Sequence, residues 1–193
     1  MSILLKNVQI VEGDQILAPQ DLYISGGIIE QMGIDLPLPK GATLISHPHA
    51  FVSAGWMDLG TDTCEPGFES RDDLQSVEQS ALAGGFTTLA IFPNTQPPLH
   101  SKSELQYILT QTKDSAVRFL PIGALSQGCE GKDLAELYDL HQTGAIAFSD
   151  GHKSVQDAGL LLRAMQYSKA FKGLIINQPL HKSIAAEIGR AHV

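Results

Sequence analysis

The spacing of apolar and polar positions changes near residue 50 of the chain. Before that point, residues 2–11 ("SILLKNVQIV") and 21–31 ("DLYISGGIIEQ") form short apolar runs with the turn sequences "EGDQ" and "SGG" around them. Short runs next to such turn residues are typical of β-strands joined by tight turns. We therefore expect residues 1–50 to form part of a small β domain.

After residue 50, apolar runs without polar alternates are separated by amphipathic helical patterns. The runs cover residues 50–59, 86–92, 117–125, 145–149 and 173–177. The helical patterns cover residues 70–83, 101–113, 131–142 and 154–171, and the last three have Ser101, Gly131 and Ser154 near their starts. This order predicts parallel strands covered on both faces, in a doubly wound sheet or a (β/α)₈ barrel. Both folds place their chemistry at the carboxyl ends of the strands.

The predicted strands are too few to close a barrel, which needs eight, and an open barrel would expose two apolar edges. We therefore expect residues 51–187 to be an incomplete (β/α)₈ barrel and the chain to be an N-terminal fragment. The ending "IGRAHV" (188–193) matches the translation of a widely used sequencing adapter, so we expect this segment to be a non-native tail.

Composition narrows the classes of partner. The 193 residues carry a net charge of −8, so the chain has no basic field for nucleic acid. No apolar run approaches the ~18 residues of a membrane span. The chain has only two cysteines and no leader pattern, which favours the reducing cytoplasm.

Three segments together identify a family resemblance. "GWMDLGTDTCEPGFESRDDL", "AGGFTTLAIFPNTQPP" and "GAIAFSDG" resemble the corresponding blocks of the dihydroorotases, in the metal-dependent amidohydrolase superfamily, and the likeness covers about residues 1–187. The resemblance implies a (β/α)₈ barrel preceded by part of a small β-sandwich. It also implies a hydrolase with two zinc ions that interconverts carbamoyl aspartate and dihydroorotate in pyrimidine biosynthesis.

The family's working positions at the first strand have changed in this chain. The family has Asp-x-His-x-His-x-Arg-Glu-Pro-Gly there, and histidines two apart on a strand can hold one metal ion. This chain has Gly60 and Asp62 at the two histidines and Cys64 at the arginine that binds the substrate carboxylate. A further metal histidine of the family, at the end of the fifth strand, corresponds to Asn177.

Two family positions are retained. Asn94 in "PNT" matches a residue that helps to bind the substrate carboxylate, and Asp150 in "FSDG" matches a carboxylate beside the metals, a candidate catalytic group. Asn94 could equally cap its own turn. A relocated metal site of mixed ligands is a second possibility, and it would use Asp62, Asp150, His152 and His181. His47 and His49 have ligand spacing, but the stretch before the first barrel strand is more simply a solvated linker.

These residues lead to a hypothesis with two alternatives. We expect a pseudoenzyme with no cofactor, because a strand end without imidazoles lacks the ligands for a metal ion, and it is the bound metal that lowers the pKa of water from about 15.7 to about 7. Such a protein would act as a non-hydrolytic partner of aspartate carbamoyltransferase and form an oligomer when full length. The alternatives are an active cyclic amide hydrolase with relocated ligands, and a pseudoenzyme that senses a ligand resembling carbamoyl aspartate or dihydroorotate through Asn94.

Overall fold

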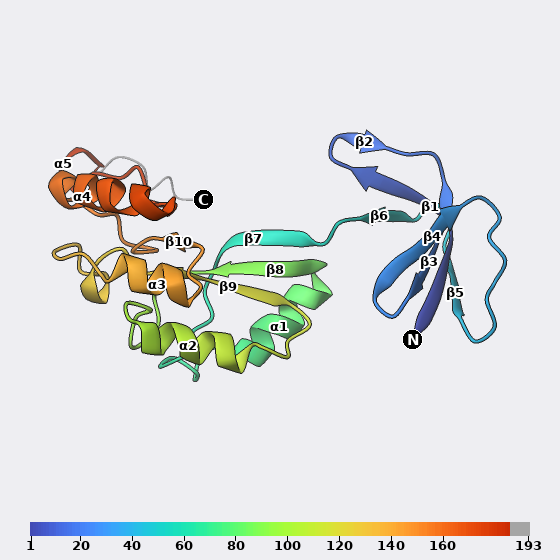
Figure 1. Cartoon of the computed structure of the whole chain (residues 1–193), viewed down its shortest axis with the longest axis horizontal. Coiled ribbons are helices and arrows are strands. Elements are labelled where there is room, and N and C mark those ends of the chain that lie inside the picture. Colours follow the sequence, from blue (N-terminus) through green and yellow to red (C-terminus); the bar gives the residue numbers. More distant parts are fainter. Residues whose placement is uncertain (186–193) are drawn as a thin grey trace. The chain divides into compact units, whose positions relative to one another are not determined.

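The computed structural model describes residues 1–185, which form two compact units, Met1–Gly55 and the chain from Trp56 onward (Figure 1). The segment 188–193, which we expect to be a non-native tail, lies outside the described residues. Each unit has its own sheet.

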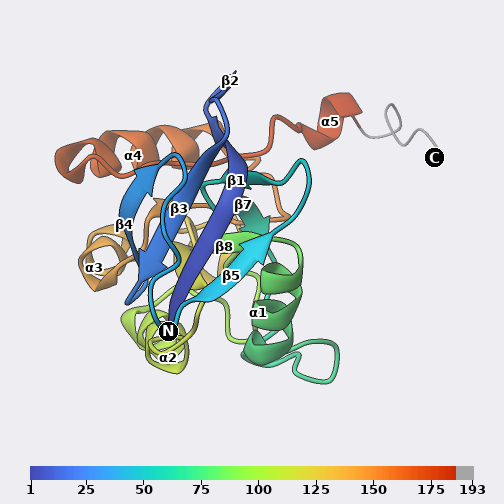
Figure 2. The ribbon, with the colours of Figure 1, turned by 90° about the vertical axis from the view of Figure 1, so that its right-hand side faces the viewer.

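The N-terminal unit is a six-stranded sheet. Its strands are β1 (Ser2–Glu12), β2 (Gln15–Ile16), β3 (Gln20–Ser25), β4 (Ile28–Gly33), β5 (Thr43–Ser46) and β6 (Phe51–Ser53). Strands β2, β1, β3 and β4 pair antiparallel in that order, while β5 and β6 pair parallel to β1. Figure 2 shows β4, β3, β1 and β5 side by side. Buried Asp21 accepts hydrogen bonds from the Lys6 ammonium (2.6 Å) and from two backbone N–H groups, of Asn7 and Leu36.

The run at 50–59, predicted as one strand, forms two. Phe51–Ser53 (β6) pairs with β1 in the N-terminal unit, whereas Trp56–Thr61 (β7) pairs with a strand of the second unit. Ala54 and Gly55 separate the two strands. An apolar run shows that strand is favoured, but not where the chain leaves one sheet for another.

The second unit is a parallel sheet of four strands in the order β10, β9, β8, β7. These are β7 (Trp56–Thr61), β8 (Phe86–Ile91), β9 (Arg118–Gly123) and β10 (Ala147–Phe148). The last predicted strand, 173–177, forms a single parallel bridge from Ile175 to Phe148. The sheet is the curled wall of a partial (β/α)₈ barrel.

Helices connect the strands and are shorter than predicted. They are α1 (Leu74–Ala83), α2 (Lys102–Gln111), α3 (Leu137–Thr143), α4 (Ala158–Ser168) and α5 (Lys182–Ala185), with 3₁₀ turns η1 (Gln127–Cys129) and η2 (Lys169–Phe171). Figure 1 shows α1, α2 and α3 along one face of the sheet. Within residues 1–185, no helix combines the length and apolar character that crossing a membrane requires.

Two helix starts differ from the sequence prediction. Helix α4 begins after Asp157, whose carboxylate accepts hydrogen bonds from the N–H groups of Gly159 and Leu160. The Ser154 hydroxyl instead donates to the carbonyls of Gln178 and Leu180. Helix α3 begins after Glu136, well beyond Gly131. Ser101 does precede α2, as predicted. Serine and aspartate are both favourable caps, so tertiary contacts decided between them.

The two faces of the parallel sheet bury different side chains. The helix-covered face holds the main core, which includes Leu89, Leu105, Ile108 and Phe148. The opposite face holds a small cluster of Ala90, Ile122 and Ala147, with Phe92 packed against it. Alternation along β8 places Leu89 on the first face and Ala90 on the second. Phe92, two residues beyond Ala90, therefore stands where the inner face reaches the strand ends.

Candidate functional site at the strand ends

Gly60 lies against the aromatic ring of Phe92. A Cβ atom built on Gly60 would stand 2.8 Å from Cζ and 2.9 Å from Cε2 of that ring, closer than real carbon contacts. No side chain fits at position 60 while the ring keeps this place. The position that the resemblance matches to the first metal histidine therefore has no ligand, and a side chain there would require the Phe92 ring to move.

A bulge in β7 changes the direction of the residues after Gly60. Asp58 pairs with Leu89 of β8, but Thr61 pairs with Ile91, so β7 uses one more residue than β8 over this stretch. Such a bulge breaks strict alternation and re-aims the side chains that follow it. In a regular strand, residues 60 and 62 would project to the same side. The bulge means that their directions cannot be inferred from strand alternation alone, without the pairing of β7 with β8.

Asp62 and His152 form a hydrogen-bonded pair across the strand ends. Nε2 of His152 lies 2.8 Å from both carboxylate oxygens of Asp62. The two side chains are 50% and 54% exposed, so water reaches both of them. The imidazole also packs edge to face on Phe92, with ring centroids 5.2 Å apart. The structure thus brings together two of the four residues of the predicted mixed metal site.

Asn94 holds the loop that follows β10. Its Nδ2 donates to the carbonyl of Asp150 (3.1 Å), and its Oδ1 accepts from the N–H of His152 (3.0 Å). Gly151 lies between them at φ +60°, and a Cβ there would overlap Oδ1 of Asn94. Both ends of the amide therefore have partners within the protein, and both partners belong to the loop after β10.

Asp150 is buried and bonded to a serine. Its Oδ1 accepts from the N–H of Ser126 (2.9 Å), and its Oδ2 accepts from the hydroxyl of Ser126 (2.5 Å). Burial, together with the nearby Asp150 charge, raises the pKa of the Cys129 thiol to about 12. Cys129 is therefore protonated near neutral pH and is not a nucleophile.

The remaining predicted residues have other hydrogen-bond partners or belong to the N-terminal unit. Oδ1 of Asn177 accepts from the N–H of Val155 (3.0 Å). Nδ1 of His181 lies 2.8 Å from the hydroxyl of Ser183 on an exposed stretch. Cys64 adopts φ +57°, and its carbonyl accepts from the N–H of Phe68. His47 and His49 belong to the N-terminal unit and are exposed.

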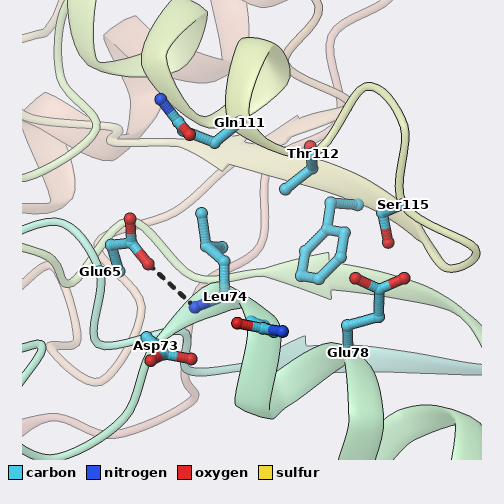
Figure 3. A pocket seen from close by; sticks show the side chains of 9 residues that line it. Glu65, Asp73, Leu74, Glu78, Gln111, Thr112 and Ser115 are labelled. Carbon is cyan, nitrogen blue, oxygen red and sulfur yellow. Dashed lines mark hydrogen bonds between the residues drawn. The ribbon is translucent and has the colours of Figure 1, made fainter.

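Glu65, which follows Cys64, turns away from the strand ends toward the helices. Its Oε2 accepts from the N–H of Leu74 at the start of α1 (3.0 Å), as Figure 3 shows, and its Oε1 accepts from the hydroxyl of Tyr107 on α2 (2.7 Å). The hydrogen bond to the Glu65 carboxylate raises the pKa of Tyr107 to about 12, and partial burial contributes a smaller part of the rise.

The cavity in Figure 3, about 250 Å³, is lined by α1, α2 and β9 residues beside Glu65. Its other carboxylates also have local partners. Asp73 accepts from the N–H of Ser76, and Glu78 accepts from the N–H of Ala116. The carboxylates of this cavity therefore join structural elements.

A second cavity, of about 240 Å³, lies beside the loops that follow β9 and β10. Asp150 and His152 line it together with Lys153 and Lys182. Glu130 also lines this cavity and is paired with Lys132, Asp150 is bonded to Ser126, and His152 is bonded to Asp62, so Lys153 and Lys182 are the groups that an anionic ligand would meet. Its size suits a small organic anion.

The residues at the family's metal positions do not fit a zinc site. Gly60 has no room for a ligand, Asp62 is paired with His152, and the oxygen of Asn177 is bonded to a backbone N–H. Among residues 1–185, no three His, Cys, Asp or Glu side chains are grouped so that they could hold a metal ion. Zinc in proteins is held by three or four such ligands.

Two residues at this site were missed by the sequence reasoning. Ser126 bonds the Asp150 carboxylate, and Phe92 fills the space beside Gly60. The sequence held a signal for Phe92. This large side chain directly follows the strand at 86–91, and Gly60 lies near the end of the neighbouring strand. Ser126 gave no comparable signal, since its contact with Asp150 spans 24 residues.

A family model described as "Dihydro-orotase-like" matches residues 50–183. The chain belongs to the dihydroorotase-like family. The curated relatives include dihydroorotases of Citrifermentans bemidjiense, 33% identical over 97% of this chain and 45% of the relative, and of Pelobacter propionicus, 30% identical over the same shares. The dihydroorotase-like chain thus spans about 45% of the length of these relatives.

Solved structures show the same fold at lower identity. The L-hydantoinase of Arthrobacter aurescens matches with a TM-score of 0.78 and 21% identity, over 97% of this chain and 44% of the hydantoinase. A dihydroorotase crystal structure matches with a TM-score of 0.65 and 18% identity, over 92% of this chain and 52% of that one. The dihydroorotase-like chain therefore has the barrel architecture of the amidohydrolases.

Proposed function

We propose that this dihydroorotase-like chain belongs to a cytoplasmic protein of pyrimidine biosynthesis that has lost hydrolysis and serves as a non-hydrolytic partner of aspartate carbamoyltransferase. The observation that carries the loss of hydrolysis is the packing of Phe92 on Gly60. Hydrolysis of a cyclic amide at neutral pH needs an activated water, which a bound metal ion supplies in this superfamily. A strand end with no imidazole, where the Phe92 ring occupies the space beside Gly60, does not support that chemistry.

The substrate side of the reaction is weakened in the same way. Cys64 replaces an arginine, so the guanidinium that would bind a carboxylate in two hydrogen bonds is absent at that position. Asn94 uses both ends of its amide within the protein. The choice of aspartate carbamoyltransferase as partner rests on the family resemblance alone, and it calls for a direct binding experiment.

The decisive experiment uses the full-length protein purified from its own host. We expect substoichiometric zinc, no hydrolysis of dihydroorotate, and co-purification with aspartate carbamoyltransferase. The dihydroorotase of Citrifermentans bemidjiense, handled identically, is the positive control for metal and turnover. Stoichiometric zinc with turnover that a chelator abolishes would instead favour the active hydrolase with relocated ligands.

Metabolite sensing is a second candidate, and the cavity with Lys153 and Lys182 favours it. In this function a small carboxylate occupies the cavity and stabilises the native state, because a ligand that binds only the folded protein raises its melting temperature. Dihydroorotate and carbamoyl aspartate are the ligands to test. A shift that disappears in Lys153→Ala, but not in Lys113→Ala far along the sequence, would support sensing; no shift would remove it.

A further inference from the structure

The strand ends of a metal-dependent barrel are joined through the ions that their side chains share. If this chain has lost the ions, as proposed above, something else must hold the loops after β7 and β10. A bound metal contributes folding energy as well as chemistry, so its loss leaves a gap both in space and in connection. Residues around Gly60 fill the space that a metal ion would occupy, and they connect the loops that a metal ion would join.

The filling comes from Phe92. It is packed against the inner cluster of Ala90, Ile122 and Ala147, and its ring occupies the space beside Gly60. The His152 imidazole also packs on the Phe92 ring, in an edge-to-face geometry. One aromatic side chain therefore contacts both the end of the first barrel strand and the loop after the fourth.

The link comes from Asp62 and His152. They are 90 residues apart in the chain and join the residue after β7 directly to the loop after β10. Asn94, in the loop that follows β8, holds the same loop after β10 through two hydrogen bonds from its side-chain amide to backbone groups. The loop is thus fastened from two strands without any ion.

We propose that Phe92, Asp62 and His152 are positioning residues that replace the structural role of bound metal at the strand ends. Phe92 excludes any side chain from position 60, and the Asp62–His152 pair holds the loop of residues 150–153 to the end of β7. A glycine is then needed at position 60, because the Phe92 ring occupies the space that a side chain would take.

The steric half is tested by a double-mutant cycle in the full-length protein. Gly60→Ala should lower the melting temperature when Phe92 is present, and should leave it unchanged or raised in Phe92→Leu, which lacks the Cε and Cζ atoms. A Gly60→Ala protein that fails to fold but is rescued by Phe92→Leu gives the same answer. Gly33→Ala, in a strand of the N-terminal unit, is the control and should cost the same in both backgrounds. Equal losses from Gly60→Ala in the two backgrounds would overturn the proposal.

The link is tested by amide hydrogen exchange at residues 150–153. Asp62→Ala and His152→Ala should each speed exchange there several-fold, and the double variant should be no faster than either single one. Lys132→Ala, which breaks an exposed pair with Glu130 (2.9 Å), is the control and should leave these amides unchanged. Additive effects, or acceleration of exchange in the parent protein by a chelator, would refute the link.

The two proposals fail in different ways. Zinc content and turnover decide whether hydrolysis has been lost, while the cycle and the exchange rates decide whether these three residues act together. An active zinc protein that still shows the Gly60–Phe92 coupling would refute the proposed function and the replacement of metal, but not the packing.

Discussion

The two faces of the parallel sheet differ in what a substitution can change. The helix-covered face is lined by large buried side chains, such as Leu105, Ile108 and Phe148. The inner face is lined by alanines and Ile122 and ends at Phe92, Gly60 and the half-exposed Asp62–His152 pair. Most of the buried apolar surface lies on the first face, so the second can lose its ligands while the barrel wall persists. This separation would allow the fold to persist in a protein that has lost the family's hydrolysis, as we propose.

The largest loss of stability is expected from a substitution in the core of the helix-covered face. Leu105 of α2 is fully buried. Leu105→Ala should lower the free energy of unfolding by about 2–5 kcal/mol, because it removes buried methyl groups and leaves a cavity. Chemical denaturation of the full-length protein measures this loss. Gln106→Ala, exposed on the same helix, is the control and should stay within about 0.5 kcal/mol of the parent.

A smaller effect is expected at Asp150, which lies at the strand ends but is buried. Asp150→Ala leaves the N–H and hydroxyl of Ser126 without their acceptor. Unsatisfied buried donors cost about 1–3 kcal/mol, and Asp150→Asn should lose less because it keeps an acceptor oxygen. Thermal unfolding measures both. If the Asp150→Ala protein were as stable as the parent and lost only ligand binding, Asp150 would be a functional group and not a structural one.

A substitution at Asn177, in the last predicted strand, should cost less than the loss of Asp150. Asn177→Ala removes the acceptor of the Val155 N–H and should cost about 1 kcal/mol, the usual net value of one hydrogen bond. Asn177→Asp keeps an oxygen at that position and should cost less. Urea denaturation compares the two variants. Equal stability of the alanine variant and the parent would show that this bond is replaced by water.

The smallest expected effect is at Tyr107, where the strand-end loop meets α2. Its pKa is raised from about 10 in unfolded chains to about 12, first by the hydrogen bond that its hydroxyl donates to Glu65, then by partial burial and by the negative charge of Glu65. The stabilisation from this bond is therefore complete below pH 10 and is lost as pH rises through 12. Ultraviolet titration should show one tyrosine that ionises late, and Glu65→Gln should lower its pKa. Tyr107→Phe should cost only about 0.5–1 kcal/mol, because the pair is exposed.

Much of the fold follows from local patterns, and the strand ends show where such patterns stop. The alternation of apolar runs and helical patterns predicted β8, β9, β10 and the approximate places of α1 to α4, because burial on both faces leaves continuous apolar strands. The same run at 50–59 concealed a change of sheet between β6 and β7. The starts of α3 and α4 also depended on distant contacts, as the bonds of Ser154 show.

The sequence alone determined the family and the absence of imidazoles at positions 60 and 62, since residue identity suffices for both. Only the tertiary structure decided what replaced them. Gly60 faces Phe92, Asp62 meets His152, and Asp150 meets Ser126, and each pair joins residues from different strand ends. Such contacts depend on strand register and on one bulge in β7, which pairing between strands sets and no local pattern encodes.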